Sequence, residues 1–167
     1  MTDAKSKTQA FIEHLRRLRT DRGAMAVLRR SLAADPEDVR AYRYVEPFVS
    51  DESGWRRRAY YLVAGLFALY SEESDSTLAK VLGDLWRRDG QRSSLERRFH
   101  ALLEADPDQL PDRLRRVVAY IASKRAGGLN YVRLLEDLLR WYRPSGRVRQ
   151  RWAREFYTMK PSPHARG

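Results

Sequence analysis

Apolar residues recur at every third or fourth position along most of this chain, the spacing that places them on one face of an α-helix. No segment sustains the alternation of apolar and polar residues that a half-buried strand requires. The sequence therefore predicts an all-α fold, a helical bundle of about eight or nine helices in two closely packed lobes. The expected helices cover 8–19, 22–33, 36–47, 55–70, 77–88, 94–105, 110–125, 129–142 and 147–157.

Residues that begin or end helices stand between these periodic segments. Asp21, Asp35 and Ser53 are each placed to cap a helix N-terminus, and Pro36 suits the first turn of the third helix. Asp106 and the proline after it break the chain between two helices. This punctuation agrees with the apolar periodicity and strengthens the all-α interpretation.

The segment 59–70 is apolar nearly all round and predicts a central core helix. The acidic, serine-rich segment 71–76 follows it and predicts a surface loop. We expect an N-terminal helical lobe over 1–76, a C-terminal helical lobe over 77–160 with the boundary open between 71 and 92, and a disordered tail at 161–167. Four tryptophans fall on apolar helix faces and are expected in the core rather than as stacking platforms: Trp55, Trp86, Trp141 and Trp152.

The chain carries 33 Lys and Arg against 22 Asp and Glu, a formal charge of +11, and its pI is near 10.3. Such a balance favours polyanionic partners. Only five of the cations are lysines, and the guanidinium fork of arginine suits phosphate contacts. There is no cysteine, and the longest apolar run is too short to span a bilayer as a helix. We expect a soluble protein of the cytoplasm with no membrane partner.

Motifs that would support catalysis are absent from the sequence. His14, His100 and His164 have no metal-binding spacing and suit surface or packing positions. The acidic cluster of 72, 73 and 75 is a weak candidate for a divalent ion and leaves nuclease activity as a minor hypothesis. We therefore expect no enzyme activity, no catalytic residue, no metal, no cofactor and no small-molecule substrate.

Helical geometry sorts the basic residues onto distinct faces. In 110–125, a stripe of Arg113, Arg116, Tyr120 and Lys124 runs beside the buried one. In the last helix, Arg147, Arg151 and Arg154 are expected opposite an apolar face of Val148, Trp152, Phe156 and Met159. With few base-reading side chains beside them, these ridges predict nucleic-acid binding without sequence specificity. The pattern leaves RNA, DNA and acidic protein open as partners.

Short motifs recur in order along the chain, at 21–23, 28–30, 41–43 and 45–48 in the first half, and at 94–99, 102–106, 129–131, 138–141 and 151–156 in the second. Together, over roughly 10–158, these motifs resemble the CasB family, the small subunit of the type I-E CRISPR surveillance complex Cascade. The resemblance implies a helical, two-lobed, non-catalytic subunit present as a pair of copies. Its implied partners are the guide-RNA backbone subunits, the large subunit, the crRNA, the target DNA with its displaced single strand, and a second copy of itself.

The resemblance also implies a role for particular cations. Family members contact the displaced non-target strand through a basic surface and stabilise the R-loop and the guide–target pairing. Lys124 follows from its helix face alone, whereas the other positions match or lie near basic positions of the family. The expected nucleic-acid-binding residues are Arg29, Arg30, Arg56, Arg97, Arg98, Arg116, Lys124, Arg147 and Arg149.

Two other functions stay open at this point. The first is a helical interaction scaffold whose basic face binds acidic proteins, with only incidental affinity for nucleic acid. The second is a transcriptional regulator, which is disfavoured because no helix-turn-helix pair with a polar recognition helix is evident.

Overall fold

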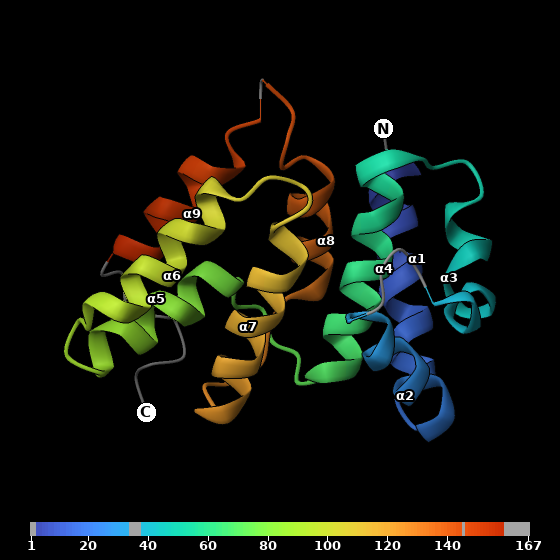
Figure 1. Cartoon of the computed structure of the whole chain (residues 1–167), viewed down its shortest axis with the longest axis horizontal. Helices are drawn as coiled ribbons and strands as arrows, with labels where there is room; N and C mark the ends of the chain where they lie inside the picture. The colour runs from blue at the N-terminus through green and yellow to red at the C-terminus, as the bar shows by residue number, and fades with distance from the viewer. Residues whose placement is uncertain (1–2, 34–37, 145, 159–167) are drawn as a thin grey trace.

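The computed structural model describes residues 3–33, 38–144 and 146–158 (Figure 1). Within these ranges the chain forms nine α-helices and one 3₁₀ turn, and no strand beyond an isolated bridge between residues 73 and 129. The all-α prediction is therefore confirmed. The elements are α1 Asp3–Leu18, α2 Arg22–Ser31, η1 Val39–Ala41, α3 Tyr42–Val49, α4 Gly54–Leu69, α5 Leu78–Arg88, α6 Ser93–Glu104, α7 Leu110–Ser123, α8 Tyr131–Leu139 and α9 Val148–Tyr157.

Side-chain caps begin several of these helices. Asp21 accepts a hydrogen bond from the amide of Ala24 at 3.0 Å, as predicted, and Asn130 caps α8 in the same way. Ser53 stands at the N-cap of α4 without a side-chain cap bond. The expected cap at Asp35 and the proline after it lie outside the described residues.

The third predicted helix is divided into η1 and α3. Asp38 caps η1 by accepting from the amide of Arg40 at 3.0 Å, and α3 then continues through Pro47 to Val49. Pro47 lacks only the amide that would pair with the carbonyl four residues earlier, and the helix ends two residues later. The expected helix end near Pro47 is therefore misplaced by two residues.

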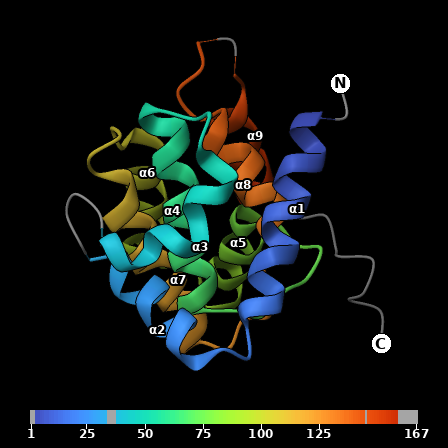
Figure 2. The same ribbon diagram turned by 90° about the vertical axis from the view of Figure 1, so that its right-hand side faces the viewer.

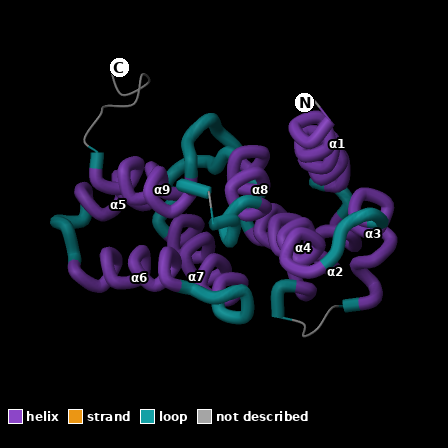
Figure 3. The backbone as a smooth tube through the Cα atoms, turned by 90° about the horizontal axis from the view of Figure 1, so that it is seen from above, coloured by secondary structure: helices purple, strands orange, loops and turns teal. Residues whose placement is uncertain are grey.

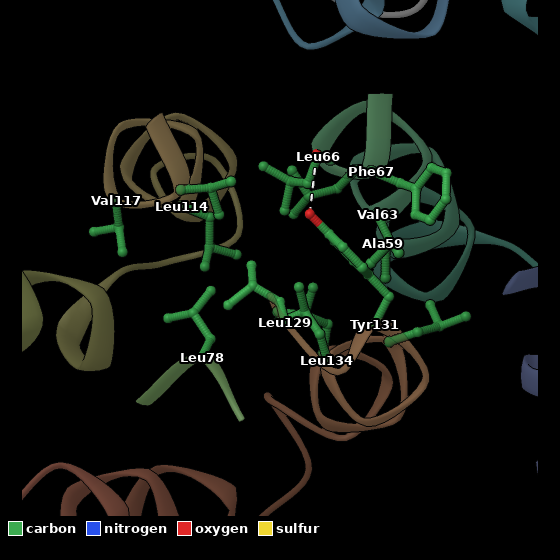
Figure 4. Packing of buried hydrophobic residues seen from close by; sticks show 14 of the residues in the cluster. Ala59, Val63, Leu66, Phe67, Leu78, Leu114, Val117, Leu129, Tyr131 and Leu134 are labelled. Carbon is green, nitrogen blue, oxygen red and sulfur yellow. Dashed lines mark hydrogen bonds between the residues drawn. The ribbon is translucent and has the colours of Figure 1, made fainter. Parts of the chain in front are cut away.

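α4 is the centre of the hydrophobic core. Its residues 59–67 are all buried, because α2, α3, α7 and α8 pack around it. Figure 4 shows Tyr131 of α8 reaching across to α4, where its O–H donates to the carbonyl of Leu66 at 3.2 Å. Burial raises the pKa of this tyrosine, so the hydroxyl stays a donor. Trp141 and Trp152 are almost fully buried, and Trp55 and Trp86 pack against the same core, as predicted.

The helices fall into two groups joined by α8 (Figure 1). α1 to α4 form one group, α5, α6, α7 and α9 form the other, and α8 lies between them. Seen from the side and from above, α2, α6 and α7 lie towards one side of the molecule, whereas α1, α8 and α9 lie towards the other (Figures 2 and 3). One hydrophobic cluster contains residues of all nine helices, and the lobe boundaries stay a prediction. No helix among the described residues has the length and apolar character needed to cross a membrane.

We predict that Gly83→Ala destabilises the protein by about 1–3 kcal/mol, the usual range for overpacking a core. A Cβ at position 83 of α5 would lie 2.3 Å from the carbonyl oxygen of Phe156 on α9, which already accepts from Arg87. The free energy of unfolding in urea measures the effect. Gly23→Ala is the control, because its Cβ meets only Asp21 Oδ1 at 3.5 Å and alanine favours the helix. Wild-type stability in Gly83→Ala would contradict this close packing of α5 on α9.

Candidate nucleic-acid interface

Exposed cations of α6 and α7 gather around one aromatic ring. Arg98 lies on α6, Tyr120 lies on α7, and Lys124 follows the end of α7. The guanidinium carbon of Arg98 is 5.4 Å from the centroid of the Tyr120 ring, and the Lys124 Nζ is 5.6 Å from it. Each cation–π contact at an exposed site contributes about 0.5–1 kcal/mol. We call Arg98, Tyr120 and Lys124 the Tyr120 cluster.

Two more expected residues lie on the same pair of helices. Arg116 is exposed one turn before Tyr120, and its Nε is 3.0 Å from Asp112 Oδ2. Arg97 is exposed on α6 and has no ion pair within the described ranges. α6 packs directly on α7, and this pair of helices with the residue after α7 carries four of the nine expected residues: Arg97, Arg98, Arg116 and Lys124.

Arg29 and Arg30 form a second cationic position in the last turn of α2. Both side chains are exposed, and neither makes an ion pair or side-chain hydrogen bond in the described part of the protein. Cations at a helix C-terminus are favoured by the helix dipole. α2, the helix that carries these arginines, lies towards the same side of the molecule as α6 and α7 (Figure 3).

The remaining expected residues have other surroundings. Arg56 lies at the start of α4, where its Nε is 3.0 Å from Glu52 Oε1 and its side chain lines a cavity. Arg149 is exposed on α9 and donates to the carbonyl of Leu103 at 3.1 Å. Arg147 is exposed just before α9. The structure does not bring these three into contact with the Tyr120 cluster.

The expected outward ridge on the last helix is wrong at Arg151. This side chain is part-buried, and its Nη2 donates to Asp137 of α8. Asp137 is only 4% exposed and also accepts from the Trp152 Nε1 at 2.8 Å, while Arg133 Nε lies 3.4 Å away. A buried carboxylate requires such partners. Helical geometry alone could not place Arg151, because the carboxylate that holds it belongs to a different helix.

Arg113 also departs from the expected basic stripe of α7. Its Nη1 donates to the carbonyl of Ala101 on α6 at 2.6 Å, in a part-buried position. This arginine therefore helps to join α6 to α7. The other members of the stripe, Arg116, Tyr120 and Lys124, keep the shared face that the sequence predicts.

The acidic loop after α4 has a structural explanation. Glu73 accepts hydrogen bonds from Arg16 at 2.9 Å and from Arg19 at 2.7 Å, so its carboxylate joins this loop to α1. Within the described ranges, no three His, Asp or Glu side chains lie close enough together to hold a metal ion. This geometry gives Glu73 a packing role.

Sequence reasoning missed a further group of cations at the start of α1, on α8 and after it. Arg133, Arg140 and Arg143 line the same cavity as Arg56, together with Lys7. Their signal was present in the sequence, because positions 133 and 140 are seven residues apart and share a helix face.

The helical bundle and its exposed cations define a small all-α protein with a strongly basic surface. The chain belongs to the CRISPR-associated protein Cse2 family, whose model matches residues 24–157.

Individual relatives agree with this membership. The CRISPR-associated protein Cse2 of Thermus thermophilus is 44% identical over 160 residues, which cover 91% of this chain and 90% of that protein. The crystal structure of CasB from Thermus thermophilus is 42% identical, with a TM-score of 0.77, over 90% of this chain and 97% of that one. A chain of a CRISPR RNA-guided surveillance complex is 27% identical, with a TM-score of 0.75, over 91% of this chain and 92% of that one. The resemblance to the CasB family is confirmed.

We predict that Glu52→Gln removes part of the loss of stability on acidification. Hydrogen bonds from Arg56 and from Lys7 hold the pKa of Glu52 below its ordinary value near 4.5, despite its burial. A lowered folded-state pKa stabilises the protein above about pH 4.5, and this contribution is lost as the pH falls below that value. The melting temperature of wild type should therefore fall more steeply below pH 4.5 than that of the variant.

Glu104→Gln is the matched control for this comparison. Glu104 is an exposed carboxylate with no ion pair in the described part of the chain. Its variant should follow the wild-type pH profile. Parallel profiles for wild type and Glu52→Gln would contradict the stabilising role of the Glu52 ion pairs.

Proposed function

We propose that this protein is a non-catalytic subunit of a type I-E CRISPR RNA-guided surveillance complex, Cascade, and acts in antiviral defence. The observation that carries the proposal is its similarity, over 91% of its length, to a chain of a solved CRISPR RNA-guided surveillance complex. In this role it binds nucleic acid through its basic surface without reading sequence. It contacts the displaced non-target strand and stabilises the R-loop and the guide–target pairing.

The side chains on the α2, α6 and α7 side support this mode of binding. Arginine and lysine contact phosphates whatever the base sequence, and a tyrosine between two cations offers a face on which any base can stack. Opening a target duplex against a guide is a nearly balanced strand exchange. A few phosphate contacts to the extruded strand therefore suffice to bias the exchange towards the open loop.

The partners follow from the same role. They are the guide-RNA backbone subunits, the large subunit, the crRNA, the target DNA and a second copy of this chain. The binding role needs no cofactor and no small-molecule substrate. The arrangement of Glu73 supports a non-catalytic role, because its carboxylate is held by Arg16 of α1 and by Arg19 in the turn after it.

We predict that Arg98→Ala with Lys124→Ala weakens R-loop retention in a reconstituted complex. Because the variant lacks two cations that bind phosphates, the dependence of log affinity on log salt should flatten by about 0.7 for each phosphate that is no longer bound. Retention of the displaced strand is measured on a labelled target duplex across a salt series. The matched control is Arg17→Ala with Arg88→Ala, which removes two arginines that have no ion pair among the described residues.

The outcomes separate the two open functions. If the Arg98/Lys124 variant assembles and holds the R-loop like the control at every salt concentration, its proposed contact with the strand is wrong. If it fails to assemble while the control assembles, the scaffold that binds acidic protein surfaces becomes the better account.

A further inference from the structure

A cationic cavity of about 400 Å³ has a lining that includes no residue of the Tyr120 cluster. Its walls come from α1, α4, α8, the segment after α8, and α9. Six cationic side chains line it, against only two carboxylates. The cations are Lys7, Arg56, Arg133, Arg140, Arg143 and Arg151.

Four of the six cations of the cavity already have partners. Lys7 contacts Asp51 and Glu52, and Arg56 also contacts Glu52. Arg133 and Arg151 both face Asp137. These pairs fix the walls of the cavity and contribute little net charge.

Arg140 and Arg143 are different. Both are exposed, and neither has an ion pair or a side-chain hydrogen bond in the described part of the chain. A backbone hydrogen bond from the amide of Arg143 to the carbonyl of Arg140, at 3.1 Å, holds them on one turn. Two guanidinium groups are thus placed on the same turn at the cavity, and no carboxylate among the described residues binds them.

The two carboxylates of the cavity are unequal. Asp137 is neutralised by two arginines and by the Trp152 indole N–H, so it opposes an incoming anion only weakly. Glu136 has no ion pair within the described residues, and it accepts a long hydrogen bond from Thr8 Oγ1 at 3.5 Å. Glu136 therefore repels an anion, and its removal should strengthen anion binding in the cavity.

We propose that this cavity binds a phosphate group, presented by a single-stranded nucleic acid. The nucleic-acid source rests on the proposed function, whereas the phosphate chemistry rests on the cavity alone. The apolar side chains of the lining, Tyr60 and Leu139, are only 1% and 8% exposed, so the site suits a phosphate and not a base or an aromatic ligand. Arg140 and Arg143 supply paired donors of the kind that bind phosphate oxygens.

Occupancy of the cavity has a structural consequence. The lining joins α1 and α4, from the N-terminal half, to α8, α9 and the turn between them. A bound phosphate therefore bridges the two helix groups of Figure 1 and stabilises their packing.

The first arm of the test uses inorganic phosphate with the full chain, and chloride at equal ionic strength as the reference. Thermal shift and calorimetry should detect phosphate binding to wild type. Arg140→Ala with Arg143→Ala should weaken it by about tenfold for each arginine removed, and Glu136→Gln should strengthen it. The control pair Arg17→Ala with Arg88→Ala should bind like wild type. Equal phosphate responses in wild type, the Arg140/Arg143 variant and Glu136→Gln would overturn the proposal.

The second arm uses a short fluorescein-labelled single-stranded oligonucleotide, followed by anisotropy, with a polyglutamate peptide as competitor. Weaker binding in the Arg140/Arg143 variant and tighter binding in Glu136→Gln support the nucleic-acid source. Phosphate binding that depends on both arginines, without any oligonucleotide binding, keeps the phosphate site and contradicts the proposed function. Oligonucleotide binding that disappears in the Arg98/Lys124 variant and is unchanged in the cavity variants keeps the proposed function and overturns the cavity. Equal competition by polyglutamate would overturn the phosphate assignment.

Discussion

The fold depends on the need to cover α4 on every side. Its residues 59–67 leave no polar face, so water must be excluded all round the helix. α2 approaches so closely that a Cβ at Gly65 would lie 2.5 Å from the side chain of Leu32. The opposite sides are closed by α7 and α8, which come from the second half of the chain. The two halves are thus joined by one shared helix, and the surfaces that carry the cations are fixed by this packing.

Some arginines of this protein stabilise the fold, and others are exposed to a partner. The formal net charge of +11 therefore does not describe the binding surface alone. Arg113 and Arg149 donate to backbone carbonyls, and Arg151 neutralises a buried carboxylate. A carbonyl or carboxylate buried without a partner would cost about 1–3 kcal/mol or more, so Arg113 and Arg151, whose bonds are part-buried, stabilise the fold. Among the described residues, the Arg29–Arg30 pair and the two cations of the Tyr120 cluster bind no such carbonyl or carboxylate, and they remain available to a partner.

Helix periodicity and capping preferences predicted the features that depend on residues close together in the sequence. The apolar stripe of α7, the central place of residues 59–67 and the cap at Asp21 all follow from helix periodicity or from a nearby amide. The position of Arg151 could not be predicted, because it is decided by Asp137 on another helix. The cavity around Arg140 and Arg143 was missed for a similar reason: its walls come from segments more than a hundred residues apart. The family resemblance supplied the overall assignment, and it did not distinguish the structural arginines from the exposed ones.

The position of α8 also determines the order in which this chain can fold. α8 packs on α1 and α4, and the indole of Trp55 donates to the carbonyl of Leu138, 83 residues further along. Contacts of such long sequence separation form late, after the loop between them has closed. During synthesis α4 therefore has an incomplete cover until residue 139 has left the ribosome. Between the synthesis of α4 and that of α8, the nascent N-terminal half therefore exposes an apolar helix, a state that favours aggregation or chaperone binding.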